Sequence, residues 1–289
     1  MQRNAMKSCV VAWVVLFAAM GCAADASAQD DPPVPAPAQA PTDAKPADPG
    51  APAAPAPAPG GVSIDEVLDA LDRQGDQMKD FTADVSLTET DELTKEGFIR
   101  AGTVRFQKLA DGDGRIRVVF KTRQAGEGKP KPEEIEYLLD KGWLTERNYR
   151  KTNQVRRQVM KPGEKVDLLK LGEGPFPLPI GQAKEDVKKM FDVEVVPAAE
   201  GDPAGTLRGR LKPKEGSQFA RRFKHIDVWV DPKAQMPRRI ETVDVNEQTR
   251  QTTDLQNVKA NTGLKDDDFR LKEVNAKDGW TFVDEPYQE

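Results

Sequence analysis

The sequence predicts a mainly β (α+β) domain between residues 62 and 289, built as one long, curved antiparallel sheet with a few helices. Three observations predict this class. Apolar and polar residues alternate with period two in about ten segments, as in strands with one buried face. The turns between segments are short, which makes neighbouring strands antiparallel. An amphipathic helix precedes them. A sheet of this length tends to curl toward a barrel, with helices on its concave side.

The domain opens with a short helix. Residues 63–66 read S-I-D-E, a capping box in which the Ser oxygen accepts from an amide and the Glu reaches back. Gly75 is the predicted end of the helix. Apolar residues recur along it at helical spacing, namely Ile64, Val67, Leu68 and Leu71.

The alternating segments follow in order along the chain. We predict strands over residues 81–88, 102–107, 116–120, 137–139, 143–145, 193–196, 207–211, 226–230, 240–243 and 252–258. Turn residues separate many of them, as in the D-G-D-G of residues 111–114 and the K-G of residues 141–142. Residues 166–171 and 182–190 read as helices.

One segment between the two predicted helices is apolar without being regular. Residues 172–180 read G-E-G-P-F-P-L-P-I and hold too much Gly and Pro for a helix or strand. Two interpretations remain open for it. The segment covers a cavity of the sheet, or it packs passively on a sheet edge.

Upstream of residue 62 the chain reads as an export signal. Arg3 and Lys7 precede an apolar run of about a dozen residues, too short for the about 20 that span a membrane. We therefore expect a signal peptide over residues 1–28, cut after Ala28 to leave a protein free in the periplasm. The M-G-C sequence ending at Cys22 predicts an alternative lipoprotein signal, cut before Cys22 and followed by acylation and membrane anchoring.

Residues 29–61 are mostly Pro and Ala and predict a disordered linker. Proline fixes φ and lacks an amide donor, so this tract neither pairs into a sheet nor fills a core. It is either a stalk that holds the domain away from a membrane or a passive tail.

Composition excludes several function classes. The two cysteines are Cys9 and Cys22, so residues 62–289 contain no disulfide, thiol nucleophile or Cys-ligated metal. Three of the 43 basic and five of the 48 acidic residues precede residue 62, which leaves a net charge of −3 for the domain. That balance argues against nucleic acid as a partner.

No motif for covalent chemistry is present, and we expect neither enzymatic activity nor a cofactor or metal. His225 is the one histidine and lacks partners of a recognisable motif. Asp266, Asp267 and Asp268 lack the alternation of a calcium loop and read as a helix cap.

Two basic stretches fit either an anionic lipid or acidic partner surface, or simply the solvated face of strands. They comprise Arg147, Arg150, Lys151, Arg156 and Arg157, then Arg208, Arg210, Arg221 and Arg222.

The order of these elements resembles the periplasmic outer-membrane lipoprotein carrier (lipoprotein-sorting, LolA/LolB-like) family, across nearly all of residues 62–289. An N-terminal amphipathic helix leads into a series of strand and turn sequences. These read F-T-A-D-V at 81–85, A-G-T-V-R-F at 101–106, L-D-K-G-W-L at 139–144, L-K-P-K at 211–214, H-I-D-V-W-V-D at 225–231, M-P-R-R-I-E at 236–241, L-Q-N-V at 255–258 and D-D-D-F at 266–269.

The resemblance implies an unclosed antiparallel barrel whose apolar cavity, lidded by helices, holds acyl chains. The implied partners are acylated lipoproteins or lipid acyl chains, an inner-membrane release complex and an outer-membrane acceptor, and the implied state is a monomer. Such carriers place an Arg at the end of the second strand to govern lid closure. The matching position here is Lys108, which lacks the planar donor fork of Arg.

The predicted ligand-binding residues are the apolar ones of the central strands and of the Pro-rich segment. They are Phe106, Val118, Phe120, Trp143, Phe176, Leu178, Ile180, Val228 and Trp229. Lining a site and filling a core require the same side chains, so both roles stay open. The predicted function is a periplasmic carrier that shelters acyl chains; the alternatives are a membrane-anchored acceptor or envelope-stress sensor of the same fold, or a stalked scaffold without cargo.

Overall fold

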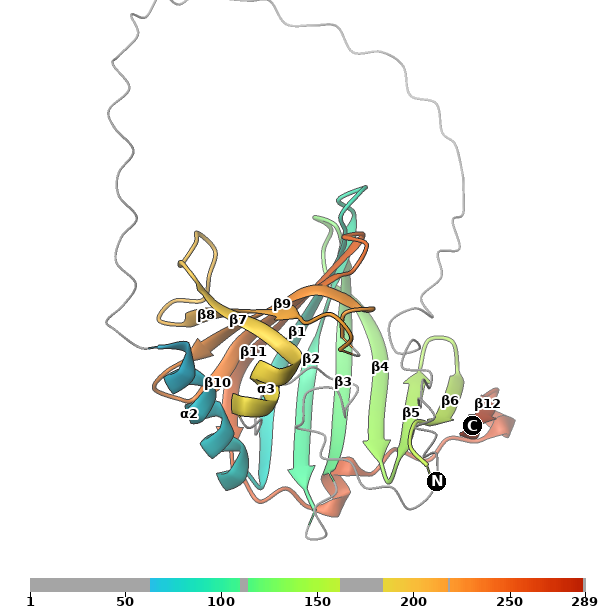
Figure 1. Cartoon of the computed structure of the whole chain (residues 1–289). Helices are drawn as coiled ribbons and strands as arrows, with labels where there is room; N and C mark the ends of the chain where they lie inside the picture. The colour runs from blue at the N-terminus through green and yellow to red at the C-terminus, as the bar shows by residue number, and fades with distance from the viewer. Residues whose placement is uncertain (1–62, 110–113, 162–183, 218, 288–289) are drawn as a thin grey trace, which may run out of the picture. The chain divides into compact units, whose positions relative to one another are not determined.

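The computed structural model describes residues 63–109, 114–161, 184–217 and 219–287. In these residues twelve strands form one curved sheet in the order β12-β6-β5-β4-β3-β2-β1-β11-β10-β9-β8-β7 (Figure 1). Neighbouring strands are antiparallel, except that β12 runs parallel to β6. The two ends of this order do not pair with each other, so the sheet stays unclosed. This confirms the predicted fold class.

The strands are β1 (Asp80–Asp91), β2 (Gly97–Lys108), β3 (Gly114–Ala125), β4 (Lys131–Asp140), β5 (Trp143–Asn148), β6 (Asn153–Gln158), β7 (Phe191–Val196), β8 (Leu207–Pro213), β9 (Phe223–Asp231), β10 (Met236–Asp244), β11 (Thr249–Ala260) and β12 (Thr281–Glu285). The helices are α2 (Ile64–Gln77) and α3 (Lys184–Met190), with two 3-10 turns, η1 (Asp266–Phe269) and η2 (Ala276–Asp278).

Alternate side chains of each strand point to opposite faces of the sheet. We call the face that carries Phe81 the inner face. The register pairs Phe81 with Phe106 and Phe106 with Ile116, so an apolar row crosses the first strands on this face. The rings of Phe81 and Phe106 stack with their centroids 5.5 Å apart. The inner face therefore supplies the buried apolar surface of the sheet.

The outer face is polar, and the C-terminal segment crosses part of it. Arg115 of β3 pairs with Asp266 at 2.5 Å and lies over the ring of Phe269, which is buried. Tyr149 meets Trp280 edge to face, with ring centroids 5.3 Å apart. Beyond this point β12 joins the sheet beside β6.

Helix α2 begins with the predicted capping box. The Ser63 amide donates to Glu66 Oε2 at 2.7 Å, and the Glu66 amide donates to Ser63 Oγ at 3.2 Å. Its end differs from the prediction, because the helix continues through Gly75 to Gln77. Met78, the C-cap, is 1% exposed. Packing of this last turn against the domain outweighs the weak helix propensity of Gly75.

Two strands were not predicted from the alternation. Strand β6 reads N-Q-V-R-R-Q and is largely half-buried, and every residue of β12 is exposed. Neither has an apolar face to produce a period-two pattern, and pairing with a neighbour decides their conformation. The predicted helix over 182–190 is observed as α3, whereas the predicted helix over 166–171 lies outside the described residues.

No helix in the described part of the chain is long and apolar enough to cross a membrane. The predicted leader, Cys22 and the proline-rich linker lie outside the described residues.

Candidate functional site

An apolar groove lies between helix α2 and the inner face of β7, β8 and β9. The helix contributes the four apolar residues of its predicted face. The groove is lined by Ile64, Val67, Leu68, Leu71, Val195, Leu207, Arg208, Gly209, Leu211, Val228 and Val230. Apart from Arg208 and Gly209, every lining residue is aliphatic, and those of the strands occupy alternate positions that face the helix. The surface suits hydrocarbon.

A glycine sets how closely α2 approaches the sheet. A Cβ at Gly209 would lie 3.0 Å from Cδ1 of Ile64, tighter than ordinary van der Waals contact. Gly209 pairs with Val228 on one side and with Val195 on the other. The helix therefore rests almost directly on the backbone of β8.

The groove is narrow in this state. Its free volume is ≈ 20 Å³, room for about one water molecule, whereas pockets for small-molecule ligands measure about 300–1,000 Å³. Val195 at its border is 46% exposed and lies on β7, the last strand of the sheet. The groove thus opens toward a sheet edge, and a larger apolar ligand requires α2 to move.

Two ion pairs join α2 to α3. Lys188 Nζ lies 2.6 Å from Asp65 Oδ1, and Lys184 Nζ lies 3.0 Å from Asp69 Oδ2. The hydrogen bond from Lys188 lowers the pKa of Asp65, and the bond to Asp69 raises the pKa of Lys184. Asp65, Asp69 and Lys188 are more than 40% exposed and Lys184 is half-buried, so each pair contributes little to stability. The two ion pairs therefore connect α2 to α3 but hold the two helices together only weakly.

Four of the predicted ligand-binding residues share the inner face. Phe106, Val118, Phe120 and Val228 are between 1% and 6% exposed, and Val118 pairs with Val104 beside Phe106. Val228 lines the groove, whereas the other three lie on β2 and β3. The structure places them in one continuous apolar surface.

The two predicted tryptophans do not belong to this surface. Trp143 precedes the inner-face residue Leu144, and Trp229 follows the inner-face residue Val228, so both side chains lie on the outer face. Arg156 covers the ring of Trp143 at 4.7 Å from its centroid. The sequence analysis grouped the tryptophans with the other apolar residues as one ligand-binding set. Strand alternation instead places consecutive residues such as Val228 and Trp229 on opposite faces of the sheet.

Other predicted positions are at the borders of the described residues. Lys108 ends β2, where it pairs with Gly114, and its amide donates to the Lys79 carbonyl at 2.7 Å. The gating role of Lys108 stays a prediction. Phe176, Leu178 and Ile180 lie outside the described residues.

The inner face becomes polar beyond its apolar floor. Arg100 is 3% exposed and donates to Glu133 at 3.2 Å, and its guanidinium also lies over the ring of Phe98. Glu89 accepts from Gln251 at 3.1 Å, and burial raises the pKa of its carboxyl. Burial also raises the pKa of Tyr137. The inner face could therefore contact the hydrocarbon part of an amphiphile with its apolar floor and the polar part with these polar side chains.

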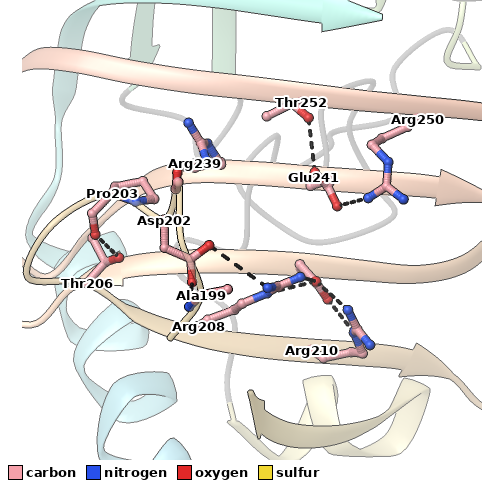
Figure 2. A network of polar contacts seen from close by, with 12 residues as sticks. Ala199, Asp202, Pro203, Thr206, Arg208, Arg210, Arg239, Glu241, Arg250 and Thr252 are labelled. Carbon is pink, nitrogen blue, oxygen red and sulfur yellow. Dashed lines mark hydrogen bonds and ion pairs between the residues drawn. The ribbon is translucent and has the colours of Figure 1, made fainter. Parts of the chain in front are cut away.

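On the outer face of the same strands, arginines and carboxylates form a network (Figure 2). Asp227 is fully buried and accepts from both Arg208 and Arg210. Burial opposes the ionised form of this carboxyl, but the hydrogen bonds from Arg210 and Arg208 outweigh it and lower its pKa. Glu241 is bound by Arg250 and Thr252.

His225 lies beside this network, which sequence reasoning did not foresee. One ligand atom each from His225, Asp227 and Glu241 lie within 4.8 Å of one another. Guanidinium groups already bind both carboxylates, so the donor set does not suit a metal ion. Burial lowers the pKa of His225, which favours the neutral imidazole.

Comparison with known proteins finds similarity of structure alone. Neither a model of a known protein family nor a curated protein sequence matches this chain. The similar solved structures include an uncharacterized conserved protein from Thermus thermophilus, with 13% identity, a TM-score of 0.42, and coverage of 76% of this chain and 97% of that chain. A LolA superfamily protein from Nitrosomonas europaea has 10% identity, a TM-score of 0.33 and coverage of 73% and 99%.

LprF from Mycobacterium bovis has 12% identity, a TM-score of 0.38 and coverage of 70% and 94%. The neighbours thus include a protein of the superfamily that the sequence resembles. At these identities and TM-scores, no ligand or partner is transferred from them.

Proposed function

We propose that this chain is a non-enzymatic carrier of the bacterial envelope that shelters the acyl chains of lipoproteins. The observation that supports this function best is the apolar groove between α2 and the inner face, which opens at β7, the last strand of the sheet in the described residues. Acyl chains are the ligands whose chemistry such a lining recognises. The sequence resemblance independently implies the same cargo.

The energetics suit reversible binding. Burial of each methylene gains about 0.8 kcal/mol, so an acyl chain of ordinary length can compete with α2 for the inner face. In this structure α2 itself covers that face through Val67, Leu68 and Leu71, each less than 10% exposed. Exchange of one apolar cover for another lets cargo enter and leave without a large net cost.

The leader predicted from the sequence supports a periplasmic location, with cleavage after Ala28 giving a soluble carrier. Cleavage before Cys22 would instead give an anchored acceptor or envelope sensor of the same fold. Mass spectrometry of the mature N-terminus distinguishes the two. An acylated Cys22 would transfer the proposal to the anchored form.

Acyl-chain binding by the purified protein tests the function directly. An environment-sensitive apolar dye is displaced by a lipidated peptide, with the unlipidated peptide as its control. Saturable, roughly one-to-one displacement by the lipidated peptide alone supports the carrier function. No displacement, or equal displacement by both peptides, would leave a scaffold or a sensor of protein partners.

A matched pair of variants locates the site. Gly209→Leu fills the groove from its floor, because even a Cβ there approaches Ile64, and we expect at least tenfold weaker binding. Lys212→Leu adds the same side chain on the exposed outer side of the same strand and should leave binding unchanged. Equal effects of the two substitutions would exclude the groove as the site.

A further inference from the structure

The loop between β7 and β8 (residues 197–206, the β7–β8 loop) lies on the outer face beside Trp229. Trp229 is 2% exposed, and the loop meets the two arginines that flank it. The guanidinium carbons of Arg208 and Arg239 lie 4.6 Å and 5.7 Å from the centroid of the Trp229 ring. The side chains of this aromatic and diarginine cluster lie on the face of β8 and β9 opposite the aliphatic lining of the acyl groove, and Arg208 is the one residue that the two share.

The loop holds its own shape and is only lightly attached to the sheet. Internally, the Ala199 amide donates to Asp202 Oδ2 at 2.9 Å, and Thr206 Oγ1 donates to the Pro203 carbonyl at 2.7 Å (Figure 2). Among the contacts of the described residues, Arg239 Nη1 donates to the Gly201 carbonyl at 2.9 Å, and Arg208 Nη1 lies 3.9 Å from Asp202 Oδ1. The second distance is too long for a hydrogen bond.

Beneath the loop the sheet is rich in donors. Arg208, Arg210 and Arg239 face two carboxylates of the sheet, Asp227 and Asp254. The third carboxylate, Asp202, comes from the loop. The indole Nε1 of Trp229 is buried and has no hydrogen-bond partner in the described part of the chain. Buried N–H groups in folded proteins almost always have an acceptor. A bound partner that supplies an acceptor would satisfy the indole N–H of Trp229.

We infer that the β7–β8 loop masks a binding site for an acidic segment of another protein, which Trp229, Arg208 and Arg239 hold in the place that Gly201 and Asp202 occupy in this structure. The loop presents a backbone carbonyl and a carboxylate from adjacent residues, as such a segment would. Tryptophan and arginine are the side chains that most often dominate the energy of protein interfaces. Arginine clusters are a recurrent device for reading acidic segments.

The test uses the loop sequence itself as a probe. A labelled peptide of residues 198–206 is titrated into the full chain, into a variant in which Asn-Gly replaces residues 198–205, and into Asp202→Asn. A second peptide carries Asn in place of Asp202. We expect the shortened variant to bind the Asp peptide saturably. Its Kd for the Asp peptide should be at least tenfold lower than the Kd of the unchanged chain for that peptide. It should also be at least tenfold lower than the Kd of the shortened variant for the Asn peptide. Asp202→Asn keeps the loop length and should bind the Asp peptide more tightly than the unchanged chain, which preserves the test if the shortened variant fails to fold.

Two further variants assign the effect. Arg208→Gln in the opened background should remove binding, whereas Gly209→Leu, on the acyl groove, should leave peptide binding unchanged. Failure of acyl binding therefore does not affect this result. Absence of binding by both opened forms, or equal binding of the Asp and Asn peptides, would overturn the inference and leave the loop a structural cover for Trp229.

Discussion

Arg210 and Asp227 form a two-point ion pair across β8 and β9, with Nε to Oδ1 at 2.7 Å and Nη2 to Oδ2 at 2.8 Å. The carboxylate is fully buried, and Arg208 binds it from the adjacent position of the same strand face. One buried anion therefore organises two cations on the outer face. Removal of the anion deprives both guanidinium groups of their hydrogen-bonded carboxylate.

Asp227→Ala should lower the free energy of unfolding by about 2–4 kcal/mol, because it strands the partners of a buried charge. Urea denaturation at pH 7 measures the loss. Asp192→Ala is the matched control on the edge strand β7, since its carboxylate is 75% exposed and lies 3.6 Å from Lys214. That control should change the free energy by no more than about 0.5 kcal/mol. Equal losses would show that burial of Asp227 contributes nothing.

Glu92 should make stability depend on pH in the acid range. Hydrogen bonds from Lys95 and Arg250 lower the pKa of Glu92 from 4.5 to about 2. Because the folded-state pKa is below the unfolded value, the stabilisation is complete above pH 4.5 and is lost as the pH falls toward 2. Urea midpoints of the unchanged chain and of Glu92→Gln should therefore differ at about pH 6 and converge near pH 2. A difference independent of pH would contradict this account.

Phe106 should be a large contributor to the inner face. It is 1% exposed and stacks on Phe81, so Phe106→Ala should cost about 3–5 kcal/mol through lost burial and the cavity that remains. Phe282→Ala removes the same ring from β12, where it is 45% exposed, and should cost less than about 1 kcal/mol. Chemical denaturation of the two variants compares them. Similar losses would mean that exposure does not govern the cost here.

Substitutions on the two faces of the sheet should have different effects on acyl-chain binding. Val195→Asp introduces a charge at the exposed mouth of the groove and should weaken displacement of the apolar dye at least tenfold. Trp143→Ala changes the outer face and should leave the displacement curve within about twofold of the unchanged chain. A strong effect of Trp143→Ala with none from Val195→Asp would place the ligand on the opposite face from the one proposed.

Much of the fold was predictable because buried residues recur in the sequence at the period of the helix or strand that contains them. The capping box at Ser63, the apolar face of α2 and the ten alternating segments all reflect local rules that need no tertiary context. Strands β6 and β12 carry no such signal, since the first is half-buried and the second exposed on both faces. Their existence depends on hydrogen bonds to neighbouring strands.

The candidate site was only partly predictable for a related reason. Val228 and Trp229 are consecutive and both buried, yet one lies in the groove and the other beneath the β7–β8 loop. Alternation predicts that the two side chains point to opposite faces of the sheet. It does not predict that α2 packs on one face and the β7–β8 loop on the other. Ile64 and Gly209 are 145 residues apart, and no local pattern pairs them.

Local periodicity and composition were enough to predict the fold class, the opening helix, most strands and the absence of cysteine from residues 62–289. The strand order, the packing of α2 on β8 and the network in which one buried Asp227 binds two arginines could be found only in the folded structure. Those features arise from contacts between distant segments, whose free energies depend on packing and dielectric surroundings that a linear sequence does not display.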